Sequence, residues 1–229
     1  MLDFKYILML FLGASLAACQ SPDMVEERLV LAFGETMFAN PGPRYDRTAT
    51  GENDSRLAKW QAAVEISVAE GATEENIALV EETLKQFAEL TDLEIKLTEP
   101  KNESAQLKVY FSGKKEFLIN HNERAACFAH SRSDRENRLE TAEVHISLID
   151  DGEWHTGCLV HELLHAFGWR GHTHRVRSAI SYMHGESELT RWDAVLMRTL
   201  YDPRLEPGIS RADAMPKVRA IIHELVEDR

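Results

Sequence analysis

The 229-residue sequence predicts an α+β fold in which helices pack against a small mixed β-sheet. Several short segments alternate apolar and polar residues, as half-buried strands do. Helical periodicity separates the first two of these segments and returns after the last. Hydrophobic residues make up 44% of the chain and charged residues 28%, a composition typical of a globular protein.

Four segments have the pattern of strands, and a fifth, shorter one is expected at an edge of the sheet. The expected strands are 64–68, 93–97, 106–111 and 142–149, with 128–130 as the edge strand. The charged stretch 131–140 is expected to form a loop or a hairpin tip. The helix that carries the candidate site follows the last and most apolar of these strands.

Helical periodicity marks the segments around the sheet. Thr73 is expected to cap a helix that ends near residue 90, and Thr190 with Asp193 resembles a capping box. The last helix is expected to begin at Ser210 or at Pro216, because a proline this deep would disturb a helix from Ser210. The other expected helices are 21–37 and, as a short one, 114–121.

Residues 1–18 have the pattern of a signal peptide that is too short to span a bilayer as a mature helix. The sequence at its end, Leu-Ala-Ala followed by Cys19, resembles the bacterial lipobox. This resemblance implies that Cys19 is lipidated and begins the mature protein; a plain secretory signal is the alternative. In enterobacterial lipoproteins an aspartate after the lipidated cysteine resembles an inner-membrane retention signal, and Gln20 stands at that position here. We therefore expect an outer-membrane lipoprotein of the bacterial cell envelope, facing the periplasm or the exterior.

The mature chain is expected to consist of an N-terminal helix and loop over 19–57 and a main domain over 58–229. The formal net charge of −12 argues against nucleic acid as a partner and against electrostatic binding to anionic lipid. The lipid anchor is therefore the expected membrane contact. The same charge weakly favours a cationic or neutral substrate.

Lipidation of Cys19 would leave Cys127 and Cys158 as the remaining cysteines. Disulfides persist outside the cytosol, so a single bridge is the simplest use of this pair. The bridge would tie the segment before the last strand to a point three residues before His161. Two buried free thiols are the alternative.

The stretch 161–172 reads HELLHAFGWRGH and carries the chemistry. Residues four apart lie on one face of a helix, so His161 and His165 can bind one zinc ion. Glu162 can then act as a general base toward a water activated by the metal. Apolar neighbours bury this helix, where unpaired histidines would be costly and a metal removes that cost. Gly168 ends the helix.

These four residues resemble the HExxHxxGxxH motif of metzincin zinc peptidases. The resemblance implies a zincin-like fold, a Zn2+ cofactor and a peptide or protein substrate. It also implies a third histidine ligand at position 171, where Gly171 stands. His172 is the preferred third ligand because it is nearest to the pattern, and His174 is the alternative.

Residues 179–185 resemble the Met-turn of the same peptidases. The resemblance implies that Met183 forms an apolar floor beneath the metal. Tyr182 and His184 flank it, and either can stabilise an oxyanion by hydrogen bonding.

The stretch 200–208, together with Cys158 and Leu159, resembles a family of secreted bacterial proteins of unassigned function. Many of its members carry a degraded helix motif, whereas both histidines and the glutamate are present here. Two functions follow as hypotheses. The first is a lipid-anchored zinc metallopeptidase with Glu162 as the general base. The second is a non-catalytic, zinc-binding lipoprotein with a zincin-like fold and a structural or interaction role.

Overall fold

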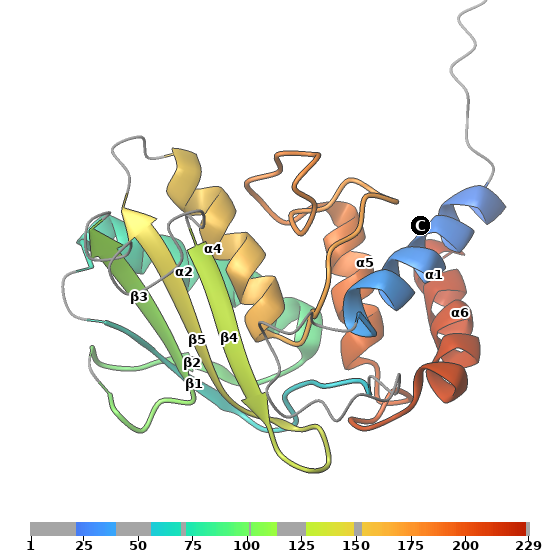
Figure 1. The fold of residues 1–229 in the computed structure, drawn as a ribbon, viewed down its shortest axis with the longest axis horizontal. Helices are drawn as coiled ribbons and strands as arrows, with labels where there is room; N and C mark the ends of the chain where they lie inside the picture. The colour runs from blue at the N-terminus through green and yellow to red at the C-terminus, as the bar shows by residue number, and fades with distance from the viewer. Residues whose placement is uncertain are drawn as a thin grey trace, which may run out of the picture.

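The computed structural model describes residues 22–39, 56–69, 72–100, 102–113, 127–148 and 153–227 (Figure 1). The expected signal peptide, Cys19 and the expected short helix at 114–121 lie outside these residues. None of the helices in the described ranges is long and apolar enough to cross a membrane.

A five-stranded mixed sheet has the strand order β2-β1-β3-β5-β4 (Figure 1). Its strands are β1 (Val64–Val68), β2 (Ile95–Leu97), β3 (Leu107–Gly113), β4 (Cys127–Ser133) and β5 (Leu139–Leu148). Neighbouring strands are parallel except β4, which runs antiparallel to β5 and forms an edge. The expected α+β class with a small mixed sheet is confirmed.

The strand at the β4 edge differs from its expected form. β4 spans seven residues, so 131–133 belong to a strand and not to the expected loop. The turn itself is narrow: Asp134 accepts the amides of Glu136 and Arg138 at 3.0 and 2.8 Å, and Asn137 has a φ of 62°. The sequence did not predict a strand at 131–133 because these residues lack the alternation of apolar and polar residues. An edge strand in contact with solvent does not need that alternation and often carries charged residues.

The described part of the chain contains five helices. They are α1 (Pro22–Met37), α2 (Glu74–Thr91), α4 (Glu153–Ala166), α5 (Arg191–Tyr201) and α6 (Arg211–Glu227). The HELLH helix, α4, follows the last strand as expected and packs against β4 and β5. It also meets α2, where the rings of Phe87 and Phe167 lie 4.8 Å apart. α1 lies beside α6 and near α5 (Figure 1).

The capping residues expected from the sequence begin their helices. Thr73 caps α2, and Thr190 forms a reciprocal capping box with Asp193 at the start of α5. The alternative start of the last helix at Pro216 is wrong, because α6 begins at Arg211 and includes this proline. Proline removes the hydrogen bond to the carbonyl of Ala212, an exposed residue whose carbonyl water can reach.

The segment before β1 joins the ends of two helices. The indole of Trp60 donates to the carbonyl of Ala166 at the end of α4 (3.0 Å). The ammonium of Lys59 donates to the carbonyls of Leu200 and Asp202 at the end of α5 (3.1 Å each). These donors satisfy carbonyls that a helix end leaves unpaired, and the lysine charge complements the helix dipole.

Lys59 gives a testable dependence of stability on pH. Burial lowers the pKa of its ammonium to about 8, while Asp202 and Glu206 act in the opposite direction. The unfolded chain therefore binds more protons than the folded chain between pH 8 and about 10.4, and the free energy of unfolding rises with pH in this window. We expect urea denaturation to show a rise of about 1–2 kcal/mol from pH 8 to 9.5 that Lys59→Met removes. An equal rise in both proteins would contradict this assignment.

Candidate metal centre

Three histidines converge at the C-terminal half of α4 and the loop that follows it. His161 and His165 lie one turn apart on α4, and His172 follows six residues after the helix ends. The Nε2 atom of His172 lies 3.1 Å from Nε2 of His161 and 3.2 Å from Nε2 of His165. These residues form a group whose candidate ligand atoms all lie within 4.8 Å of one another.

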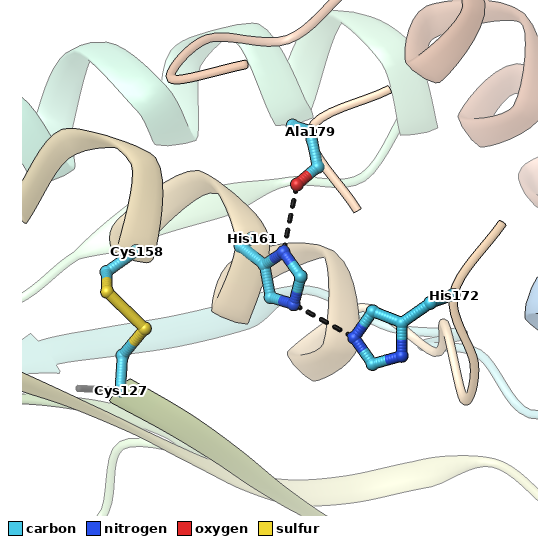
Figure 2. The surroundings of a disulfide bond; sticks show 5 residues. All are labelled: Cys127, Cys158, His161, His172 and Ala179. Atoms are coloured by element: carbon cyan, nitrogen blue, oxygen red, sulfur yellow. Dashed lines mark hydrogen bonds between the residues drawn. A yellow bond between two sulfur atoms is a disulfide. The ribbon is translucent and has the colours of Figure 1, made fainter. Parts of the chain in front are cut away.

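The other ring nitrogen of each helical histidine points at a backbone carbonyl. Nδ1 of His161 lies 2.9 Å from the carbonyl oxygen of Ala179, and Nδ1 of His165 lies 2.6 Å from that of Trp169 (Figure 2 shows the His161 contact). A carbonyl oxygen can only accept, so Nδ1 carries the proton in both rings. The lone pairs of both Nε2 atoms are thus left for a metal ion.

Burial keeps these rings neutral, which is the form that binds metal. It lowers the pKa of His165 to about 3 and that of His172 to about 4, and the neighbouring imidazoles act in the same direction. Burial also lowers the pKa of His161, against the effect of the Ala179 carbonyl. At neutral pH the three rings therefore need no deprotonation before a cation binds.

The donor set fits zinc. Zn–N distances of about 2.0–2.1 Å in a tetrahedral site place two ligand nitrogens about 3.3 Å apart, close to the two observed Nε2 separations. A catalytic zinc site has three protein ligands, such as three imidazole nitrogens, and keeps its fourth position open, whereas a structural zinc site has four protein ligands.

The loop that carries His172 is held by α1. The amides of Arg170 and Gly171 both donate to the carbonyl of Thr36, at 2.8 Å each. A Cβ atom on Gly171 would lie 2.6 Å from the carbonyl oxygen of Glu35, so only glycine allows this approach. The carboxylate of Glu35 also accepts a hydrogen bond from the hydroxyl of Thr173 (2.8 Å).

Gly168 makes the turn between α4 and this loop. Its φ of 110° is a conformation that favours glycine, and a Cβ atom there would collide with the carbonyl oxygen of Ala58. The extra residue between Gly168 and His172, relative to the peptidase motif, is accommodated in the loop that α1 holds.

Glu162 is buried between α4 and the edge strand. Its side chain is 5% exposed, and its carboxyl group accepts the backbone N–H of Ala129 on β4. Burial raises the pKa of this carboxyl group to about 8, and the Ala129 amide acts in the opposite direction. A divalent cation bound to the adjacent histidines would lower this pKa, because it favours the charged carboxylate.

A disulfide joins Cys127 at the start of β4 to Cys158 on α4, with 5.9 Å between the Cα atoms (Figure 2). The bridge precedes Ala129 by two residues on the strand and Glu162 by four on the helix. It therefore fastens together the two elements whose contact holds the Glu162 carboxyl group. The alternative of two free thiols does not occur in this structure.

The remaining candidates lie on the solvent-exposed side of the three histidines or away from them. The Tyr182 ring stacks on His172 and His161, with centroids 4.3 and 5.0 Å apart, and is 75% exposed. His174 is exposed and its Nδ1 lies 2.8 Å from the hydroxyl of Ser181, so the structure brings His172, and not His174, to the helical pair.

The Met-turn residue differs from its expected place. Met183 is 73% exposed, and so does not form an apolar floor beneath the histidines in this structure. Two consecutive turns, closed by Ser181 N to Ser178 O (3.1 Å) and His184 N to Ser181 O (3.3 Å), direct 182–183 outward. His184 is partly buried, and its Nδ1 atom has no hydrogen-bond partner among the described residues.

Residues 29–220 match the family model described as "Protein of unknown function (DUF2927)". The chain belongs to this family. The expectation of a family of unassigned function is therefore confirmed. A comparison with curated proteins finds no match.

Solved structures similar to this member of the family include a zinc-protease and two myroilysin structures. High choriolytic enzyme 1, a hatching enzyme zinc-protease from the medaka fish Oryzias latipes, is 15% identical with a TM-score of 0.40, over 63% of this chain and 94% of that chain. A crystal structure of myroilysin is 13% identical with a TM-score of 0.40, over 77% and 96%. Another myroilysin structure is 16% identical with a TM-score of 0.33, over 48% of this chain and half of that chain.

Proposed function

We propose that the protein is a zinc-dependent peptidase of the bacterial cell envelope, anchored through a lipid on Cys19. The observation that carries the proposal is the group formed by His161, His165 and His172, with Glu162 next to the first of them on the same helix. Two carbonyl acceptors orient the helical rings so that their Nε2 atoms face the third histidine.

Zinc bound by the three Nε2 atoms would supply a Lewis acid that lowers the pKa of a bound water and polarises a substrate carbonyl. Glu162 takes the proton of the attacking water and passes it to the leaving amine. The Ala129 amide holds the Glu162 carboxyl group, and the disulfide holds β4 against α4 during both transfers. The Tyr182 ring, stacked on His172, places a phenol on the solvent-exposed side of the three histidines, where it can donate a hydrogen bond to a developing oxyanion.

Glu162 distinguishes this function from zinc binding without turnover. A site that only binds metal needs no general base, and a buried carboxyl group with a single amide donor is unfavourable for stability. Its presence one residue after a ligand therefore favours catalysis.

A peptide-library assay on the mature protein tests the proposal. We expect cleavage that a zinc chelator abolishes and that added Zn2+ restores, because the three imidazoles bind the metal reversibly. Stoichiometric zinc binding without cleavage of any peptide would instead indicate the non-catalytic, zinc-binding function.

A further inference from the structure

Asp193 is a buried carboxylate without an assigned role in the metal centre. It lies in the first turn of α5 and is 0% exposed. Its Oδ1 atom accepts the hydroxyl of Ser178, and its Oδ2 atom accepts the amides of Ala179 (3.0 Å) and Thr190 (2.8 Å) and lies 2.8 Å from the Thr190 hydroxyl. The contacts with Thr190 belong to the capping box of α5, whereas the other two reach across to the loop after the metal-binding histidines.

Ala179 connects this carboxylate to a metal ligand. Its amide donates to Asp193, and its carbonyl oxygen accepts Nδ1–H of His161 at 2.9 Å (Figure 2). A chain of two hydrogen bonds therefore runs from α5 through one residue to the first histidine of the motif.

Both peptide planes at Ala179 depend on Asp193. The plane before Ala179 is held directly, through its amide. The plane after it contains the Ala179 carbonyl and the amide of Ile180, and this amide donates to the Ser178 hydroxyl oxygen (3.2 Å), which in turn donates to Asp193. The direction of the carbonyl toward His161 is thus set by one side chain.

His165 has no need of such an anchor. Its acceptor is the carbonyl of Trp169, and the Trp169 amide donates to Leu164 within the turn that ends α4 (3.1 Å). The helix end itself therefore places that carbonyl, whereas the His161 acceptor lies on a loop 18 residues away in sequence.

We propose that Asp193 is a positioning residue of the metal centre, which fixes the Ala179 carbonyl and so holds His161 with its Nδ1 protonated and its Nε2 free for a divalent metal ion. The inference rests on the proposed metal site and does not depend on peptide hydrolysis. Groups that orient a metal-bound histidine typically change metal affinity about 10–100-fold when they are removed.

The test compares Asp193→Ala with Asp193→Asn and with Thr190→Ala. Thr190→Ala is the matched control. It removes the side-chain cap of α5 and the contact of the Thr190 hydroxyl with Asp193 Oδ2 (2.8 Å), but it leaves the contacts of Asp193 with Ser178 and with the Ala179 amide, which lead to His161. Asp193→Asn keeps an acceptor oxygen for the two amides and an NH2 group toward Ser178. If Asp193→Ala does not fold, Ser178→Ala replaces it, since it removes the hydroxyl that joins Asp193 Oδ1 to the Ile180 amide and leaves the Asp193–Ala179 contact in place.

Zinc affinity, measured by competition with a chelator, is the first measurement. We expect Asp193→Ala to bind zinc about 10–100-fold more weakly, Ser178→Ala and Asp193→Asn to lose less, and Thr190→Ala to stay within about threefold of the unchanged protein. An equal loss in Asp193→Ala and Thr190→Ala would overturn the proposal, because helix capping alone would then explain it. An equal loss in Asp193→Ala and Asp193→Asn would also overturn it.

The imidazole Nδ1–H resonances of the metal-free protein are the second measurement. Asp193→Ala should shift or broaden the resonance of His161 while that of His165 stays in place. Equal changes in both resonances, or none in that of His161, would overturn the proposal. A protein that bound no zinc would contradict the proposed function, and this measurement would still test the role of Asp193.

Discussion

Glu162→Gln is expected to retain zinc and to lose at least about a hundred-fold in kcat/KM, the scale of a lost general base. The amide cannot accept a proton at neutral pH, but its oxygen can still accept the Ala129 amide that holds the side chain. The three histidines are unchanged, so metal binding is expected to persist. The measurements are peptide hydrolysis and zinc content on the same preparation.

Glu140→Gln is the matched control, because it makes the same substitution at an exposed position of β5. This variant should keep the hydrolysis rate. Undiminished hydrolysis by Glu162→Gln would remove the assignment of the general base. Loss of zinc together with activity would instead indicate that Glu162 contributes to the metal centre itself.

His172→Ala is expected to weaken zinc binding by more than about 100-fold. Loss of a group that only orients a metal ligand typically weakens metal binding about 10–100-fold, and loss of the ligand itself should cost more. His172 supplies the Nε2 atom that approaches both helical histidines, and two nitrogens alone leave a zinc site incomplete. Hydrolysis should fall with zinc occupancy and recover partly at high zinc concentration.

His174→Ala tests the alternative third ligand. Its ring contacts the Ser181 hydroxyl and lies outside the histidine group, so its replacement should leave zinc affinity within about twofold of the unchanged protein. A larger loss in His174→Ala than in His172→Ala would reverse the assignment.

The helical part of the site follows from local rules. A four-residue spacing brings His161 and His165 to one face, and Gly168 marks the end of the helix. Capping residues likewise predict the starts of α2 and α5. Each of these features depends on residues within a few positions of one another, so a single sequence contains the information.

The rest of the site depends on contacts between distant segments. The amphipathic pattern over 21–37 predicts a helix, but not that Thr36 and Glu35 hold the loop with His172. The capping box predicts a local role for Asp193, but not its contact with the Ala179 amide. Neither of these two contacts can be predicted from a local sequence pattern, because tertiary packing brings the contacting residues together.

Met183 shows the limit of carrying a motif over. The stretch 179–185 has the order of residues found in a Met-turn, yet its methionine is 73% exposed. The turns at Ser178 and Ser181 decide which side chain points inward, and they bury Ala179 and Ile180 instead.

X-ray absorption at the zinc edge of the purified mature protein tests the central claim most directly, because it counts the histidine ligands. The three-histidine site predicts one zinc ion per chain, bound by three imidazole nitrogens at about 2.0–2.1 Å and one oxygen that does not belong to the protein. Zinc bound by sulfur, by fewer than three histidines, or not at all would contradict it.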